Sequence, residues 1–459
     1  MLRKIKGTEW WICGAMAIFC LAAETSAQDQ GVTTVSTYIR PGTVNASGGI
    51  WGYTGTDKKE YALLTTQEPG GLSVLEIWDG TKAVVPPKER GYITAGGNSL
   101  WQEVVTCGGP FAFRISQTIS MGLQVIDLRP LNTGGDAKEI KQITTFFSTA
   151  HAFYCDETVT PNRLFVTYEN TAGIKIFSME DPLNPKLLST TVGQAHDSYA
   201  RGNRMYAYKG SAGTIFIYDI TNPAAPVRMG TITPPRIGYM HSGELSEDGK
   251  YLFTATETSG IPMYIYDVSD PVSPKKVGEF PAIVDGITNK ILHNVYVKGN
   301  TIFLGHYQSG LRVLDITNPI VPKEYAFQRH STNTSQWGGT WGAYPHFKSG
   351  LVIYGEMQKG LFVVKVIDNP NTRITNRFTQ STLGFEGFQN GLLNFRLPES
   401  GTYQISLRTS DGREAYHHNA IGTAGTQTLA VSKDLASGNY ALRLSHNESV
   451  LNTSIMLKK

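Results

Sequence analysis

Several signatures that identify common enzyme classes are missing from this sequence. It contains no G-x-S-x-G nucleophile motif, no P-loop and no glycine-rich dinucleotide fingerprint. It also lacks an EF-hand loop and the calcium-binding nonapeptide repeat. The formal net charge is only +3, which gives no indication of nucleic acid as a partner. No stretch of about ten residues between its repeated segments has the apolar spacing of an amphipathic helix.

Cysteine is also scarce, with four residues in 459. Cys13 and Cys20 lie in an apolar N-terminal stretch that we expect to be removed, so Cys107 and Cys155 remain. An oxidising compartment permits a disulfide between them. Two buried free thiols fit the sequence at least as well, because cysteine is common in apolar cores.

The N-terminus has the three parts of a secretion signal. Arg3, Lys4 and Lys6 provide positive charge, an apolar stretch follows over residues 10–23, and small residues come next. This pattern predicts a signal peptide over residues 1–27. The apolar stretch is short for a membrane helix, so we expect a secreted chain with no transmembrane span after processing.

A strand-and-turn unit is repeated along most of the chain. In one copy, Gly310–Asp315 has the apolar and β-branched residues of a buried strand, and Thr317-Asn318-Pro319 forms a turn. The positions equivalent to Asp315 in all copies are Glu76, Asp127, Ser178, Asp219, Asp267, Asp315 and Lys365. The steps between them are 51, 51, 41, 48, 48 and 50 residues. Such a period holds about four short strands, so seven copies predict an all-β protein with a seven-bladed β-propeller over residues 50–367.

The aspartates of the repeated unit suggest a local role. They directly precede a turn, and a short acceptor side chain there satisfies the N–H groups of the turn. We therefore expect them to stabilise turns rather than to bind calcium.

The segments that flank the repeats have a different character. Polar residues 28–49 form a leader that we expect to supply a strand closing the ring. Residues 368–380 are turn-rich and mark a linker. Residues 381–459 contain short alternating apolar segments separated by turns, which predicts a small C-terminal β-sandwich.

Short motifs occur in one order at the spacing of the repeats: Ile50-Trp51-Gly52-Tyr53, Ala150-His151, Ala195-His196-Asp197, Met240-His241-Ser242, His293-Asn294-Val295 and Trp341-Gly342-Ala343-Tyr344. On these motifs the repeat region resembles the LVIVD-repeat propellers, specifically the choice-of-anchor B family. The resemblance implies a shared propeller and a C-terminal attachment that differs between members. It implies no defined biochemical activity.

Further motifs lie near the C-terminus: Leu397–Tyr403, Ser410–Arg413, Leu435–Tyr440 and Lys458-Lys459. On these the segment resembles the sorting domains of type IX secretion, although Gly384-Phe385 stands where an Asn-Pro pair is usual. The resemblance implies that the secretion machinery recognises this domain. It also implies a location outside the cell or on the outer-membrane surface.

Histidine recurs just before the predicted first strand of successive blades, at His151, His196, His241 and His293. A second set stands five residues before the repeated strand: Glu169, Glu257, His306 and Glu356. First strands line the channel of a propeller. The four histidines, with Glu169, Glu257 and Glu356, could therefore hold a divalent metal at one channel mouth. The other interpretation is that each histidine hydrogen-bonds main chain at a blade junction, and recurrence in successive blades favours this structural role.

Aromatic residues suggest a second kind of site. Trp101 takes the histidine position in the second blade, and Trp337 and Trp341 share a glycine-rich loop. Stacking on a ligand such as a sugar would use these rings, although large aromatics in such folds more often belong to the core. The predicted ligand-binding set is Trp101, His306, Trp337, Trp341 and Tyr344.

The favoured function is binding. We expect a secreted or cell-surface module that recognises an extracellular protein, peptide or glycan through one propeller face. The alternative is a metal-dependent enzyme, a hydrolase, lyase or oxidase, that uses the His/Glu cluster at the channel mouth, with no catalytic residue assigned. A third possibility is a structural component of the cell surface.

Overall fold

The computed structural model describes most of the chain after the predicted signal peptide. The described ranges are 29–99, 101–167, 173–282, 290–330, 337–369, 383–389, 392–397, 400–409, 411–423, 425–431, 435–446 and 449–457. Within them the chain is all β, apart from one short 3₁₀ helix, η1 (Arg129–Thr133). No helix in these ranges is long and apolar enough to cross a membrane. The predicted signal peptide, most of the linker and Glu169 lie outside the described residues.

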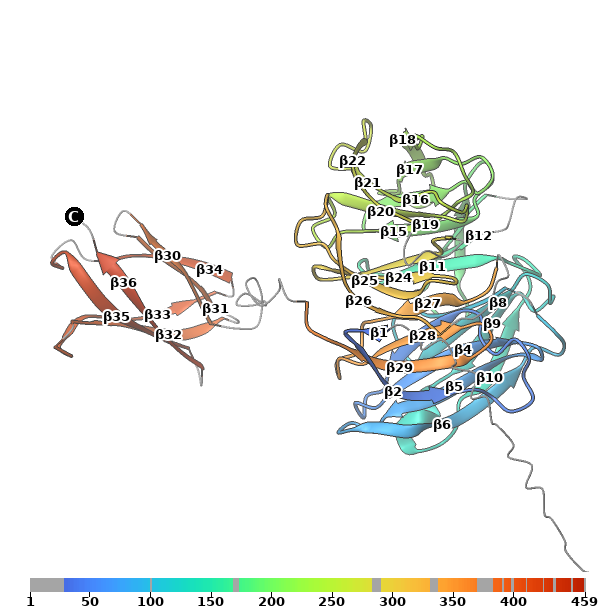
Figure 1. Cartoon of the computed structure of the whole chain (residues 1–459), viewed down its shortest axis with the longest axis horizontal. Coiled ribbons are helices and arrows are strands. Elements are labelled where there is room, and N and C mark those ends of the chain that lie inside the picture. Colours follow the sequence, from blue (N-terminus) through green and yellow to red (C-terminus); the bar gives the residue numbers. More distant parts are fainter. Residues whose placement is uncertain are drawn as a thin grey trace, which may run out of the picture.

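The described residues from 29 to 366 form seven antiparallel sheets (Figure 1). The first sheet contains β3 (Ile50–Thr54), β4 (Glu60–Gln67), β5 (Gly70–Trp78) and β6 (Ala83–Thr94). The second contains β7 (Gln102–Thr106), β8 (Phe111–Ser116), β9 (Leu123–Asp127) and β10 (Lys138–Ile143). The third contains β11 (Ala152–Asp156), β12 (Arg163–Thr167), β13 (Lys175–Ser178) and β14 (Lys186–Thr190). The next two are β15 (Asp197–Arg201), β16 (Arg204–Tyr208), β17 (Ile215–Asp219) and β18 (Val227–Ile232); and β19 (Met240–Leu245), β20 (Tyr251–Thr256), β21 (Met263–Asp267) and β22 (Lys275–Phe280). The last two contain β23 (Asn294–Lys298), β24 (Thr301–His306), β25 (Gly310–Asp315) and β26 (Lys323–Gln328); and β27 (Thr340–Tyr344), β28 (Val352–Glu356) and β29 (Gly360–Val366).

The repeated sequence unit is the third strand of each sheet. β25, for example, is buried along its whole length, as its apolar sequence predicts. The aspartate at its end accepts a hydrogen bond from the turn, from the Thr317 N–H to Asp315 Oδ1 at 2.9 Å. Asp219 and Asp267 accept equivalent bonds from Thr221 and Ser269 at 2.7 and 2.9 Å. The expectation that these aspartates stabilise turns is confirmed.

The seven sheets close into a ring. Their first strands contact one another in the order β3, β7, β11, β15, β19, β23 and β27, and β27 contacts β3 again. The N-terminal segment reinforces this closure, because β2 (Val32–Tyr38) pairs with β29 as the outer strand of the last sheet. The short β1 (Asp29–Gln30) pairs with β26 in the sheet before it. The leader therefore supplies the closing strand that its position suggested.

A disulfide joins two neighbouring sheets of the ring. Cys107, just after β7, is bonded to Cys155 in β11, with a Cα–Cα distance of 5.5 Å. Of the two alternatives that the sequence left open for this pair, the structure has the disulfide. Both cysteines are buried in an apolar core that includes Phe113 and Leu164.

The described residues after 383 form two further sheets. One contains β30 (Gly384–Gln389), β31 (Leu392–Leu397) and β34 (Gly425–Ala430); the other contains β33 (Glu414–Gly422), β32 (Gly401–Arg408), β35 (Gly438–His446) and β36 (Ser449–Leu457). Alternate residues of β35 are buried, including Leu442 and Leu444. They pack with Leu393 and Phe395 of the other sheet in one apolar core.

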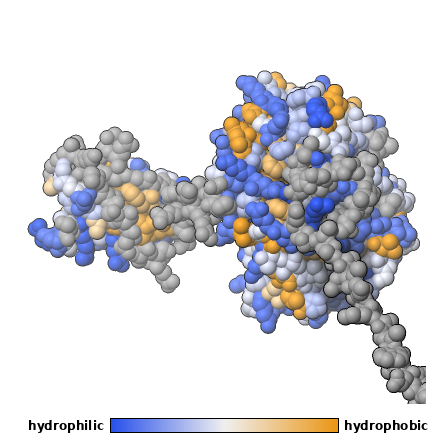
Figure 2. All heavy atoms as spheres, viewed as in Figure 1, coloured by the Kyte–Doolittle hydropathy of each residue, from blue (hydrophilic) through white to orange (hydrophobic). Residues whose placement is uncertain are grey.

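The surface in view is mainly polar. Hydrophilic residues dominate this face of the ring, and apolar residues occur in small separate groups (Figure 2). Val192, Val227 and Ile237 are exposed apolar residues of this scattered kind. Isolated exposed apolar residues are normal on soluble proteins and do not mark a binding surface.

Candidate functional site

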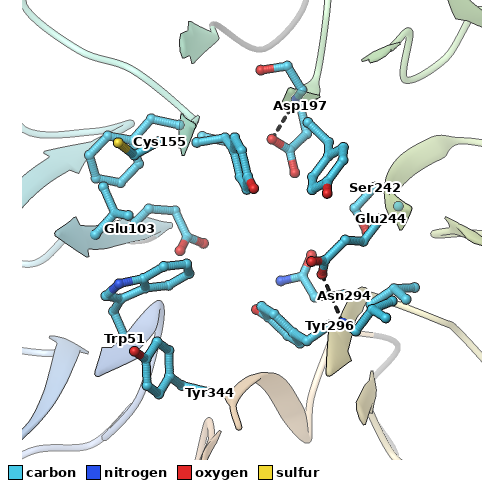
Figure 3. A pocket seen from close by; sticks show the side chains of 18 of the residues that line it. Trp51, Glu103, Cys155, Asp197, Ser242, Glu244, Asn294, Tyr296 and Tyr344 are labelled. Carbon is cyan, nitrogen blue, oxygen red and sulfur yellow. Dashed lines mark hydrogen bonds between the residues drawn. The ribbon is translucent and has the colours of Figure 1, made fainter. Parts of the chain in front are cut away.

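The channel through the ring contains a cavity of about 530 Å³. All seven first strands contribute residues to its wall. Histidines at the start of the first strands line one end of it, and Arg201 at the end of β15, Glu247 and His346 line it toward the opposite strand ends. The side chains drawn in Figure 3 point into this space from several sides.

The local fold explains why the histidines meet at one end. His151, His196 and His293 each directly precede a first strand, and their N–H groups bond to carbonyls of Thr167, Tyr208 and Gly305 on the second strands. His241 lies within β19, where the pairing with β20 shifts register between Met240 and Ser242. A β-bulge of this kind redirects one side chain.

The four imidazoles, named here the histidine cluster, form a continuous row. The ring centroids of His151 and His196 are 4.2 Å apart, those of His196 and His241 are 4.6 Å apart, and those of His241 and His293 are 4.2 Å apart. The Nε2 atoms of His151 and His196 lie 3.2 Å from each other. All four residues are buried.

Glu257 joins the histidine cluster from the loop after β20. Its Oε2 lies 3.9 Å from His241 Nε2, and its Oε1 lies 3.6 Å from His293 Nε2. The Tyr307 hydroxyl donates to Glu257 Oε1 at 2.6 Å. One donor atom from each of His151, His196 and His241 lies within 4.8 Å of the others, and the same holds for His241, Glu257 and His293. Either group of three is compact enough to hold one metal ion.

Burial favours the neutral form of three of these imidazoles. Mainly through burial, the pKa of His241 and of His293 falls to about 3, and the nearby His151 contributes to both shifts. The pKa of His196 is also well below its ordinary value, because of burial and the three surrounding imidazoles. Neutral imidazoles retain the lone pair that a metal or a hydrogen-bond donor requires.

Three carboxyl groups project into the cavity: Glu103 of β7, Asp197 of β15 and Glu244 of β19 (Figure 3). Burial raises the pKa of Glu103 to about 8, of Asp197 to about 7 and of Glu244 to about 8. The Trp341 indole N–H donates to Glu103 Oε1 at 2.9 Å, and the Val297 N–H donates to Glu244 Oε2 at 3.0 Å. Each of these bonds favours ionisation but only partly offsets burial. Glu103 and Glu244 therefore hold their protons near neutral pH.

Aromatic rings form another part of the cavity wall. The rings of Trp51 and Tyr344 are 5.2 Å apart, and the Trp51 indole N–H donates to Thr106 Oγ1 at 3.1 Å. Phe153, Tyr199 and Tyr296 line the same space. These fixed rings offer apolar faces beside the carboxyl groups.

The structure gathers some of the predicted site residues and separates others. His151, His196, His241, His293 and Glu257 come together, whereas Glu356 accepts hydrogen bonds from the Gln358 and Lys359 N–H groups of its own turn. A carboxylate before a tight turn can cap that turn, and Glu356 is in neither compact group of possible metal ligands among the described residues. Glu169 lies outside the described residues.

The predicted ligand-binding set divides in the same way. Trp341 and Tyr344 line the cavity. The His306 Nε2 bonds to the Ala282 carbonyl at 3.0 Å, and His306 does not line the cavity. Trp101 and Trp337 do not line the cavity either, since Trp101 packs against a separate apolar cluster and Trp337 is 44% exposed.

Sequence reasoning missed the cavity carboxyl groups and the side chains behind the histidines. Glu103 lies two residues after Trp101, Asp197 one residue after His196 and Glu244 three residues after His241, so their proximity to the channel was available as a signal. Gln117 and Tyr239 bond to His151 and His196 from neighbouring loops. No repeat marks those two residues, so only the folded arrangement reveals them.

Comparisons with known proteins agree with this architecture. Residues 192–233 and 292–326 match the LVIVD repeat. None of the curated proteins matches the chain. The crystal structure of the mitotic checkpoint complex contains a similar chain, with 9% identity and a TM-score of 0.53, covering 80% of this chain and 98% of that one. A putative 6-phosphogluconolactonase from Bacteroides fragilis has 13% identity and a TM-score of 0.46, covering 61% of this chain and 83% of that one.

The LVIVD match and the chain of the mitotic checkpoint complex define the fold class. The chain is a β-propeller protein that contains LVIVD repeats. At such low identity the structural likeness concerns the fold alone.

Proposed function

We propose that this chain is a secreted binding protein whose channel cavity takes up a small, positively charged organic ligand. The observation that carries this proposal is the cavity of about 530 Å³, lined by carboxyl groups and aromatic rings. Pockets for small molecules usually have volumes of roughly 300–1,000 Å³, with a few polar groups that fix orientation.

The charges around the cavity favour a cation. Five acidic residues line it, against a single arginine, Arg201; the acidic residues are Glu103, Glu157, Asp197, Glu244 and Glu247. A cation near Glu103 and Glu244 would stabilise their ionised forms. Binding would then release protons and become stronger as the pH rises through about 7–8.

The aromatic wall supports the same ligand class. Trp51 and Tyr344 present ring faces next to the carboxyl groups, and ring faces attract ammonium groups by about 0.5–2 kcal/mol. A neutral sugar could stack on the same rings, but it would not compensate the buried acidic groups.

The remaining parts of the proposal concern architecture and export. The ring would be a seven-bladed β-propeller of the choice-of-anchor B type, and the two C-terminal sheets would form a β-sandwich that acts as a type IX sorting domain. Residues 1–27 would direct secretion. The disulfide between Cys107 and Cys155 supports an oxidising compartment.

Calorimetric titration of the purified full-length mature chain tests the ligand class. Choline, spermidine and lysine serve as cationic probes, with glucose as the neutral control. At pH 8 we expect at least one cation to bind, and we expect Glu103→Gln/Glu244→Gln to weaken its affinity by about tenfold or more. The matched control is Glu279→Gln, an exposed position on the outer strand β22.

Two results would contradict the proposal. One is the absence of binding by every cation between pH 6 and 9. The other is unchanged affinity in the double carboxyl variant. Binding of neutral glycans alone would retain a binding function but reject the cationic ligand class.

A second candidate function, a metal-dependent enzyme, is favoured by the histidine cluster at one end of the same cavity. Its first requirement is a bound metal ion. A hydrolase, lyase or oxidase would in addition need substrate chemistry that no motif in this chain identifies.

A further inference from the structure

We infer that the histidine cluster and Glu257 bind one late first-row transition-metal ion, such as zinc or copper, at the histidine-lined end of the channel cavity. The inference goes beyond ligand uptake, which does not require a metal. It depends on two overlapping groups of possible ligands: His151, His196 and His241, and His241, Glu257 and His293. His241 belongs to both groups.

The observed spacing suits a common metal. Two nitrogens that each lie about 2.0–2.1 Å from one tetrahedral zinc ion are about 3.3 Å apart. The Nε2 atoms of His151 and His196 are 3.2 Å apart. Little movement of these two side chains is therefore needed for both to bind the same ion.

The Nδ1 atoms of three of the imidazoles contact polar groups outside the histidine cluster. Gln117 Oε1 lies 2.7 Å from His151 Nδ1, the Tyr239 hydroxyl lies 2.9 Å from His196 Nδ1, and the Trp341 carbonyl lies 2.6 Å from His293 Nδ1. The Gln117 and Trp341 oxygens can only accept, so they favour the tautomer of His151 and His293 in which Nε2 carries the lone pair that a metal binds. The Tyr239 hydroxyl can donate or accept and orients the His196 ring. Metal-binding histidines usually have such partners.

His241 provides an independent indication of a missing ligand. It is only 5% exposed, yet its Nδ1 has no hydrogen-bond partner among the described residues. Leaving a buried polar atom unsatisfied costs roughly 1–3 kcal/mol. The β-bulge nevertheless holds this ring between His196 and His293.

The distribution of the histidines around the ring of sheets argues against a purely structural role for them. A residue that only stabilises the junction between sheets would be expected in every repeat. Histidine occurs at the start of four consecutive first strands, β11, β15, β19 and β23. Trp101 precedes β7 and Trp341 begins β27, so the histidines are concentrated on one side of the channel.

The donor atoms select the class of metal. Imidazole nitrogens with one carboxylate suit zinc, copper, nickel or iron, whereas calcium and magnesium prefer oxygen ligands. His151, His241 and His293 also line the cavity. An ion bound here could therefore contact a ligand in that space.

Metal loading of the full-length chain tests the inference. The protein is stripped with a chelator, loaded separately with zinc or copper, and freed of excess metal; bound metal is then measured by mass spectrometry. We expect one ion per chain. For the copper-loaded protein, electron paramagnetic resonance should show splitting from several nitrogen ligands.

Variants distinguish the cluster from other histidines. His241→Ala and His293→Ala should each weaken metal affinity by about 100-fold or more. His241→Gln provides a second substitution if alanine impairs folding, which circular dichroism will reveal. His346→Ala, which changes a cavity histidine remote from the cluster, should bind metal like the wild type.

The inference is overturned if the wild type retains neither zinc nor copper, or if both cluster variants keep the wild-type stoichiometry. Metal that is lost only in the His417→Ala/His418→Ala variant would place the binding site on the C-terminal domain. That result would also overturn the inference. Cation binding is measured separately on chelator-treated protein. If the protein binds no metal but the chelator-treated protein binds a cation, the proposed ligand-binding function stands. If it binds metal but no cation, the metal site stands and the ligand-binding function fails.

Discussion

Deletion of residues 29–38 from the mature chain is expected to lower the free energy of unfolding of the ring by about 5 kcal/mol or more. The deletion removes β1 and β2, and β29 loses its outer partner. Val32 is buried in one core, while Val35 and Tyr38 pack against another. Each buried apolar side chain contributes roughly 1.5–3 kcal/mol, and an unpaired β29 would also promote aggregation.

Chemical denaturation followed by intrinsic fluorescence measures this effect. The matched control is Thr33→Ala/Thr37→Ala, which changes two exposed residues of β2 and keeps its pairing. We expect the control to remain within about 0.5 kcal/mol of the wild type. A deletion variant that unfolds cooperatively at the wild-type denaturant concentration would contradict the role of β2 in closing the ring.

Glu103→Gln is expected to make the ring more stable at pH 8 by on the order of 4 kcal/mol. Burial raises the pKa of Glu103 from 4.5 to about 8; the Asp197 charge adds to this rise and the Trp341 indole N–H opposes it. Between these two pH values the unfolded chain loses the proton while the folded chain keeps it. The stability contribution of this group is therefore complete below about pH 4.5 and is lost as the pH rises through about 8. Each pKa unit corresponds to about 1.4 kcal/mol.

The comparison requires denaturation curves of both proteins at pH 5 and pH 8. Glutamine keeps an oxygen that can accept the hydrogen bond from Trp341, so the packing of the site is preserved. The stability difference between variant and wild type should grow in favour of the variant as the pH rises. Glu279→Gln, which changes an exposed side chain, should follow the wild type. A difference that does not change between the two pH values would show that Glu103 is not held in a protonated state.

The architecture was accessible from the sequence because each repeat places the same apolar strand in the same environment. The third strands, such as β25, are buried on both faces, so their apolar pattern recurs clearly. The turn after four of the seven strands reuses an aspartate as a hydrogen-bond acceptor, as at Asp219 and Asp315. Repetition thus reports a shared structural requirement.

The site was harder to predict from the sequence, because residues at matching positions of the repeats have different contacts. His306 and Glu257 occupy matching positions in the sequence, yet His306 bonds to the Ala282 carbonyl while Glu257 faces the histidine cluster. Glu356 occupies the same position again and caps a turn. Local loop conformation decides among these outcomes, and the spacing of residues in the sequence carries no information about it.

The cavity carboxyl groups show a second limit. Glu103 and Glu244 lie on first strands whose neighbours include both buried and cavity-lining residues. An alternating pattern identifies the face of an ordinary sheet, but the channel receives side chains from both faces of the inner strands. For that reason the sequence did not indicate which acidic residues would meet.

The most direct test of the channel as a ligand site is a crystal structure of the full-length chain with the cation that calorimetry selects. We predict electron density for the ligand inside the cavity, between the Trp51 and Tyr344 rings and the Glu244 carboxyl group. An empty channel at saturating ligand concentration, with the cation bound only on the outer surface, would contradict the proposed function.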